Sequence, residues 1–158
     1  MADDKENLLE GLLKAIEAER EGYTLYKMAA DSTTDPKGKE VFATMAREEW
    51  EHIEFLQAQY DSVLKTGQPD LSVKLGPRAD LSGGFPIFTH GLKERLGATS
   101  VETGALSIAV SLEKNAVKFY KWQSQTAKVP EVKRFFAELA EWESGHYDAL
   151  IKQQEALQ

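Results

Sequence analysis

The feature that most constrains the fold is an internal repeat built around glutamate and histidine. In the first half of the chain a glutamate is followed thirty positions later by a Glu-x-x-His pair, and the second half repeats this spacing with an offset of 94 residues and no gap. The aligned segments, residues 19–56 and 113–150, also share prolines at equivalent positions, Pro36 and Pro130. We therefore expect two similar helical hairpins related by a pseudo-twofold axis. The six repeated polar residues are Glu19, Glu49, His52, Glu113, Glu143 and His146.

Apolar residues recur at three- and four-residue steps in four stretches of the chain, which predicts four amphipathic helices. The first helix is expected from about residue 5 to residue 30, and the second starts at Pro36, where Asp35 provides an N-cap. Thr99 and Glu102 read as a capping box at the start of the third helix, and the fourth begins at Pro130. The predicted hairpins span residues 5–64 and 99–157.

Residues 65–98 show no sustained period and are rich in glycine and proline, so we expect a long connector inside a single domain of residues 1–158. Within it, Ile87 to Leu96 could hold a short helix. Short loops inside each hairpin and one long connection between the second and third helices predict an all-α four-helix bundle with a crossover. This is the ferritin-like topology.

Composition and charge exclude several classes of function. The net charge of −7 argues against nucleic acid or an anionic membrane as a partner. The chain has no cysteine, which excludes disulfides, Cys-ligated metal sites and a thiol nucleophile, and fits a cytoplasmic location. The acidic, polar N-terminus does not resemble a signal peptide, and no apolar run approaches the roughly 20 residues of a membrane span.

The repeated glutamates and histidines share their helix faces with apolar residues. Residues three apart lie on one side of a helix, and Glu49 and His52 fall between Met45 and Leu56. An ionised carboxylate buried alone costs many kcal/mol, and four together would repel one another. Two divalent cations would offset the four negative charges, and two neutral imidazoles would complete the coordination. The pattern therefore predicts a buried site for two metal ions.

The combined pattern resembles the rubrerythrin-like branch of the ferritin-like superfamily, on the residues Glu19, Tyr26, Glu49, His52, Glu113, Tyr120, Glu143 and His146. The resemblance covers both hairpins but not the connector. It implies a site for two iron ions, with manganese or zinc as alternatives. By this resemblance Glu49 and Glu143 bridge the ions, whereas Glu19 and Glu113 are terminal ligands. His52 and His146 would each bind one ion, and Tyr26 and Tyr120 would hydrogen-bond to ligand carboxylates.

The same resemblance implies a homodimeric oxidoreductase that oxidises Fe²⁺ with peroxide or O₂, in oxidative-stress defence or iron handling. Full-length rubrerythrins carry a Cys-rich rubredoxin domain that feeds electrons to the metal site. This chain has no cysteine, so sustained turnover would require an external electron donor. They also carry an extra carboxylate where this chain has Ala116. The remaining ligand set resembles that of bacterioferritin, but Trp50 replaces its haem-binding methionine, so no haem is expected.

Simpler interpretations remain open from sequence alone. Any one carboxylate could belong to the surface glutamates of these acidic helices, among which we count Glu17, Glu21, Glu48, Glu51 and Glu141. Of these, Glu51 in particular is expected to face solvent.

Other residues near the pattern also have simpler interpretations. Tyr26 and Tyr120 could be core residues only. Gly22 and Ala116 could either leave room for an oxygen species or simply allow close helix packing. Trp50, Trp122 and Trp142 could relay electrons or serve packing, and His90 is expected at the surface. Alternative functions are a non-catalytic metal carrier or iron buffer, and a di-iron oxygenase acting on an organic substrate.

Overall fold

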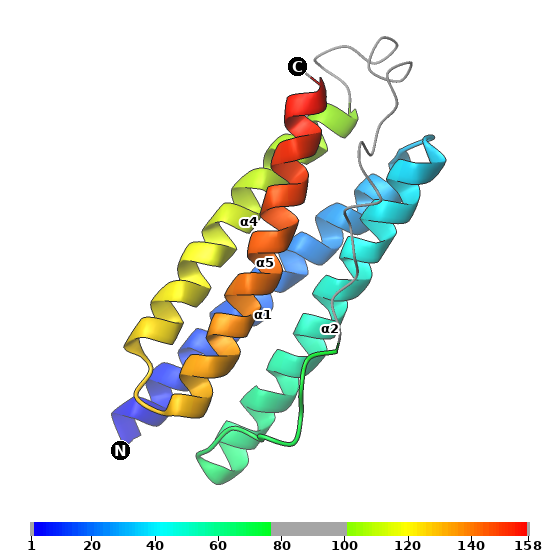
Figure 1. Ribbon diagram of the computed structural model, residues 1–158. Coiled ribbons are helices and arrows are strands. Elements are labelled where there is room, and N and C mark those ends of the chain that lie inside the picture. Colours follow the sequence, from blue (N-terminus) through cyan, green and yellow to red (C-terminus); the bar gives the residue numbers. More distant parts are fainter. Residues whose placement is uncertain (1, 77–100, 158) are drawn as a thin grey trace.

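Four long helices make up the structure, a computed structural model that describes residues 2–76 and 101–157 (Figure 1). Helix α1 covers Ala2–Ser32, α2 Pro36–Thr66, α4 Val101–Thr126 and α5 Pro130–Leu157, and the described residues contain no strand. Pro36 and Pro130 begin α2 and α5, as predicted. Helix α1 ends at Ser32, two residues past its predicted end. The prediction stopped short because Asp31 and Ser32 are exposed polar residues, which do not continue the apolar period.

The ends of α2 follow directly from its sequence. The Asp35 side chain accepts a hydrogen bond from the backbone N–H of Gly38 at 2.8 Å, which satisfies one of the free donors of the first turn. At the other end Gly67 adopts a left-handed conformation with φ of 79°, and its N–H donates to the Val63 carbonyl at 2.8 Å. Glycine adopts this conformation without the steric cost of a side chain.

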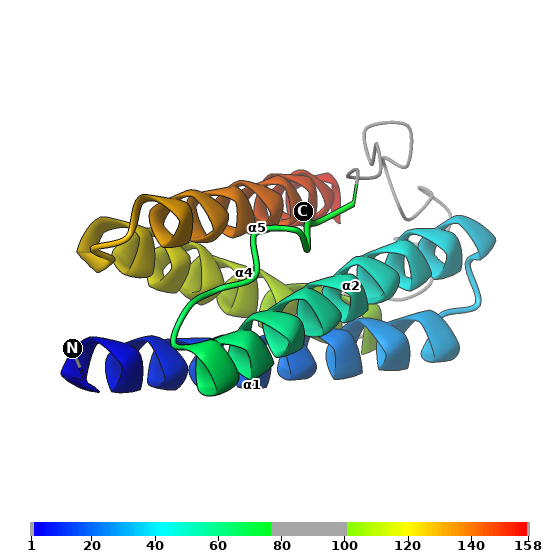
Figure 2. The same cartoon turned by 90° about the horizontal axis from the view of Figure 1, so that it is seen from below.

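The helices form two antiparallel hairpins, α1–α2 and α4–α5, which stack on each other with α1 against α4 (Figure 2). Helices α2 and α4 run in the same direction (Figure 1), so the chain between them has to return along the bundle. The predicted ferritin-like, all-α bundle with a crossover is therefore confirmed. None of the described helices carries an apolar stretch long enough to cross a membrane.

The first part of the connector is fastened to α2 by one buried side chain. The Gln59 amide donates to the Asp70 carbonyl at 2.9 Å, and its oxygen accepts from the Asp70 N–H at 2.8 Å. The short helix predicted for Ile87 to Leu96, His90 and the capping residue Thr99 lie outside the described residues.

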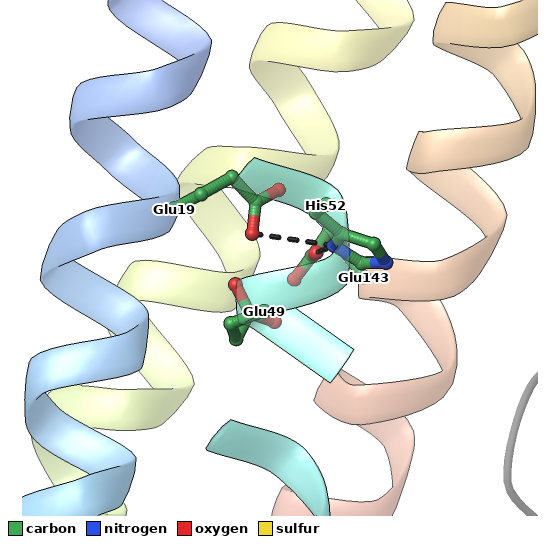
Figure 3. Close-up of side chains that lie close together, drawn as sticks. All are labelled: Glu19, Glu49, His52 and Glu143. Carbon is green, nitrogen blue, oxygen red and sulfur yellow. Dashed lines mark hydrogen bonds and ion pairs between the residues drawn. The ribbon is translucent and has the colours of Figure 1, made fainter. Parts of the chain in front are cut away.

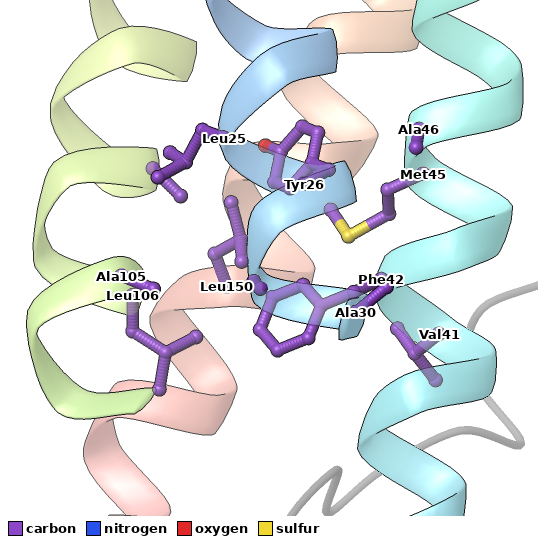
Figure 4. Close-up of a cluster of buried hydrophobic side chains, with 12 residues drawn as sticks. Leu25, Tyr26, Ala30, Val41, Phe42, Met45, Ala46, Ala105, Leu106 and Leu150 are labelled. Carbon is purple, nitrogen blue, oxygen red and sulfur yellow. The ribbon is translucent and has the colours of Figure 1, made fainter. Parts of the chain in front are cut away.

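The core consists of two apolar clusters with the polar repeat residues between them along every helix. One cluster contains Tyr26 and Phe42 and is drawn in Figure 4, and the other contains Tyr120 and Phe136. The ring centroids of Tyr26 and Phe42 are 6.4 Å apart, and those of the repeat-related Tyr120 and Phe136 are 6.1 Å apart. This near-equality shows that the sequence repeat is also a structural one.

Candidate metal centre

All six repeated glutamates and histidines are buried side chains that meet in the middle of the bundle. Helices α1 and α4 supply one glutamate each, and α2 and α5 each supply a Glu-x-x-His pair. Two overlapping groups have ligand atoms within 4.8 Å of one another: Glu19, Glu49, His52 and Glu143 in one, and Glu49, Glu113, Glu143 and His146 in the other. Figure 3 shows the first group. The structure thus brings the predicted residues together, and their binding of metal stays a prediction.

The overlap between the two groups has a simple geometry. Glu49 and Glu143 belong to both, whereas each remaining glutamate and each histidine belongs to one. The Nδ1 atom of His52 lies 2.8 Å from Glu143 Oε1 and 3.2 Å from Glu19 Oε2. The Nδ1 atom of His146 lies 3.0 Å from Glu49 Oε1 and 3.4 Å from Glu113 Oε1. Each imidazole therefore turns the same nitrogen towards the carboxylates.

Two tyrosines hold the glutamates of α1 and α4 from the opposite hairpin. The hydroxyl of Tyr120 donates to Glu19 Oε1 at 2.5 Å, and that of Tyr26 donates to Glu113 Oε1. Both rings are also part of the core clusters. Core packing and hydrogen bonding to a carboxylate are therefore both present. A buried tyrosine hydroxyl needs such a partner, and here the partner is an atom of the candidate site.

The donor set fits divalent metal ions. Among the described residues, several site atoms are buried without a hydrogen bond of normal geometry: Glu49 Oε1, Glu113 Oε2, Glu143 Oε1 and His52 Nε2. Buried polar atoms of folded proteins are nearly always satisfied. Metal coordination would satisfy the three carboxylate oxygens, and imidazole with carboxylate suits iron, manganese and zinc. The buried carboxylate and histidine cluster is compatible with a di-iron site.

Without metal, this cluster retains protons. Burial raises the pKa of Glu49 well above its usual value, and the neighbouring carboxylates of Glu143 and Glu19 raise it further. Burial and Glu143 likewise raise the pKa of Glu113. Burial alone would lower the pKa of His52, but the carboxylates of Glu19 and Glu143 outweigh it and raise that pKa to about 10.

Two further groups complete this proton balance. Burial opposes ionisation of Glu143, but hydrogen bonds with Glu113, His146 and His52 lower its pKa well below the usual value. Burial would lower the pKa of His146, yet its carboxylate partners, led by Glu113, raise it well above the usual value. The metal-free site therefore compensates its negative charge by binding protons, which a metal ion must displace.

Glu48 corrects the sequence interpretation. We counted it among the surface glutamates, but it is only 4% exposed and its Oε2 lies 2.6 Å from Nε2 of His146. The reason is that the opposite hairpin covers this side of α2, which the periodicity of α2 alone does not reveal. The internal repeat held a usable signal, because position 48 aligns with Trp142, a residue type expected to be largely buried.

The other residues singled out from sequence differ in their surroundings. Glu17, Glu21 and Glu141 are exposed, as expected, whereas Glu51 is partly buried and faces solvent only in part. Trp50 and Trp122 are exposed at the surface, whereas Trp142 is buried. The ring centroids of Trp142 and His52 are 4.7 Å apart.

Gly22 lies against the site, and Ala116 packs beside the second core cluster. A Cβ atom added at Gly22 would lie only 3.0 Å from Glu49 Oε2. The absence of a side chain at this position therefore gives the Glu49 carboxylate its room.

Two cavities lie away from the cluster. One of about 420 Å³ is lined by residues of the α1 N-terminal half and of the α4–α5 turn, including Gly11 and Trp122. Another of about 350 Å³ lies between α1 and α2 beside Tyr23 and Trp50. None of the six site residues lines either cavity.

Comparison with known proteins agrees with this geometry. The family model described as Rubrerythrin matches residues 10–99 and 104–158, which include most of both hairpins and all six site residues. Neither the curated proteins nor the solved structures give a significant match. On the extent of the family match, supported by the bundle topology and the buried cluster, the chain belongs to the rubrerythrin family.

Proposed function

We propose that this protein is a di-iron carboxylate oxidoreductase that oxidises Fe²⁺ with hydrogen peroxide or O₂. It would serve peroxide removal or iron handling. The observation that carries the proposal is the pair of overlapping donor groups, which share Glu49 and Glu143 and have one histidine each. Such an arrangement suits two ions held side by side by common carboxylates.

Iron is the proposed metal, with manganese or zinc as alternatives, and no haem is expected. Two Fe²⁺ ions bound there would supply two electrons, one from each ion, which is what reduction of peroxide requires. Four carboxylates balance the four positive charges of two divalent ions. The chain contains no thiol that could donate electrons, so repeated turnover requires an external reductant.

The protein's own contribution is a dry, pre-arranged site. All six residues are at most 2% exposed, so bulk water is excluded. Tyr120 and Tyr26 hold the terminal glutamates in place through their hydroxyl groups. Gly22 leaves room beside Glu49, because a Cβ atom at this position would lie 3.0 Å from Glu49 Oε2.

The oxygenase alternative requires a pocket for an organic substrate beside the metal ions. The two cavities described above are lined by none of the six site residues, so neither of them could serve as that pocket. Peroxide and O₂ need only a narrow approach.

We also propose a cytoplasmic homodimer. Exposed large apolar side chains occur on α1 and α4, among them Leu13, Met28, Ile108 and Trp122. Burying such groups against a second copy would remove apolar surface from water. Light scattering of the purified protein tests this part of the proposal.

Stopped-flow kinetics tests the activity. The protein is loaded anaerobically with about two Fe²⁺ per chain and mixed with H₂O₂ or with O₂, and oxidation is followed by absorbance. We expect oxidation much faster than that of free Fe²⁺ under the same conditions, and loss of the acceleration in Glu143→Ala. Tight, reversible binding with no acceleration would instead indicate a metal buffer and overturn the enzymatic proposal.

A further inference from the structure

The two histidines occupy equivalent positions in the repeat but have different surroundings. Nε2 of His146 lies 2.6 Å from a carboxylate oxygen of Glu48, and both side chains are buried. Nε2 of His52 has no hydrogen-bond partner among the described residues. Its ring instead packs in a T-shaped contact with Trp142. Glu48 and Trp142 are themselves equivalent in the repeat, so the asymmetry arises from this one pair of positions.

The two histidines differ at Nε2, on the side of the ring that faces away from the shared carboxylates. Both histidines direct Nδ1 towards the shared carboxylates. An imidazole that binds an ion through Nδ1 keeps its proton on Nε2. On His146 that N–H can donate to Glu48, which fixes the orientation of the ring and makes Nδ1 a stronger donor. On His52 the same N–H finds no acceptor in the part of the chain that the structure describes.

The remaining ligand residues are of the same type at the two positions. Glu49 and Glu143 belong to both donor groups. Glu19 and Glu113 each accept a hydrogen bond from a tyrosine of the opposite hairpin. The main difference in polar surroundings is therefore the carboxylate of Glu48 behind one histidine and the indole of Trp142 behind the other.

We propose that Glu48 is a positioning residue that makes the two metal positions unequal. The position beside His146 binds its ion more tightly and fills first. The position beside His52 binds more weakly and exchanges more readily. The inference rests on the proposed two-metal site, and it adds an order of filling that the ligand set alone does not contain.

Anaerobic calorimetric titration with Fe²⁺ alone tests this order. Wild-type protein should bind in two steps of different affinity. Glu48→Ala should weaken the tighter step by about 10–100-fold and leave the weaker step unchanged. Glu48→Gln keeps an acceptor oxygen but loses the charge, so its loss should be smaller. Glu54→Gln, at an exposed position on the same helix, is the matched control and should change neither step.

Two more measurements assign the steps to residues. His146→Ala should remove the tighter step, and His52→Ala the weaker one. With one ⁵⁷Fe²⁺ per chain, Mössbauer spectra of the wild type should show one dominant doublet, whereas Glu48→Ala should show two as the ion divides between the positions. A purely structural role for Glu48 would lower thermal stability without producing this redistribution.

The outcomes separate this inference from the proposed function. Two wild-type steps of equal affinity, or equal weakening of both steps in Glu48→Ala, would overturn the order of filling while leaving the two-metal site intact. Removal of the tighter step by His52→Ala would also overturn it. Failure of the wild type to bind Fe²⁺ would overturn both proposals. Should Glu48→Ala not fold, the near-isosteric Glu48→Gln variant decides the question by the same titration.

Discussion

At the scale of single residues, the sharing of Glu49 between both donor groups predicts a large effect of its loss. Glu49→Ala removes an oxygen donor from each group, so binding should fall from about two ions per chain to one or fewer. Equilibrium dialysis followed by elemental analysis measures this stoichiometry. Glu54→Ala is the control, because Glu54 is exposed whereas Glu51 is partly buried. Equal behaviour of the two variants would show that the site is assigned to the wrong face of α2.

A substitution at Gly22 can test whether the space beside Glu49 matters for Fe²⁺ oxidation, independently of its effect on helix stability. An alanine there would place Cβ 3.0 Å from Glu49 Oε2 and force that carboxylate to shift. We expect Gly22→Ala to slow Fe²⁺ oxidation at least about tenfold, since misplacement by about 1 Å can cost more than that. Gly104→Ala is the control: its Cβ meets nothing within 4 Å, so it should stabilise α4 by up to about 1 kcal/mol without affecting oxidation. Unchanged kinetics in Gly22→Ala would mean that Gly22 serves helix packing alone.

At the scale of helices, the repeat pairs a capped helix start with an uncapped one. Asp35 caps α2, and the equivalent position before α5 is Val129, which is 45% exposed. The backbone at the two positions makes the same turn, since Lys39 N–H donates to the Asp35 carbonyl at 2.9 Å and Lys133 N–H to the Val129 carbonyl at 3.0 Å. Val129→Asp should therefore supply the missing cap.

Thermal unfolding of the metal-free protein measures both directions of this prediction. Asp35→Ala should destabilise the protein by about 1 kcal/mol, and Val129→Asp should stabilise it by a similar amount. For a chain of this size each change shifts the melting temperature by roughly 2–4 °C. Since neither position touches the metal site, Fe²⁺ binding should be unaffected. A destabilising Val129→Asp would show that the two helix starts differ in geometry.

At the scale of the whole molecule, the features that could be predicted are those encoded within a helix or within the repeat. Regular spacing placed Glu19 and Glu113 on apolar faces, and prolines indicated where α2 and α5 begin. The burial of Glu48 depends instead on which surface of α2 the other hairpin covers, and that is a property of packing between distant segments. The different surroundings of His52 and His146 were missed for the same reason, because Nε2 of His146 and the ring of His52 both contact residues of the opposite hairpin.

The protons held by the metal-free cluster predict how stability depends on pH. With its pKa raised to about 10, His52 stays protonated in the folded protein over a range where the unfolded chain, with a value of 6.5, has lost the proton. Its stabilising contribution is complete below pH 6.5 and is lost as the pH rises to about 10. The raised pKa values of His146, Glu49 and Glu113 act in the same direction. The pKa of Glu143 is lowered, so this carboxylate is ionised in both the folded and the unfolded protein between pH 6.5 and 10. It therefore does not contribute to the change of stability with pH over this range.

Bound metal replaces these protons, so the loaded protein should not lose this stability. We expect the melting temperature of the metal-free protein to fall between pH 6.5 and 10, by an amount that reflects a few kcal/mol. The gain in melting temperature on adding Mn²⁺ in the absence of O₂ should widen over the same range, because metal affinity rises as the ligands lose their protons. His52→Gln, which cannot be protonated, should flatten part of the slope. A metal-free melting temperature that is constant or rises over this range would contradict a cluster balanced by protons, and with it the view that two cations take their place.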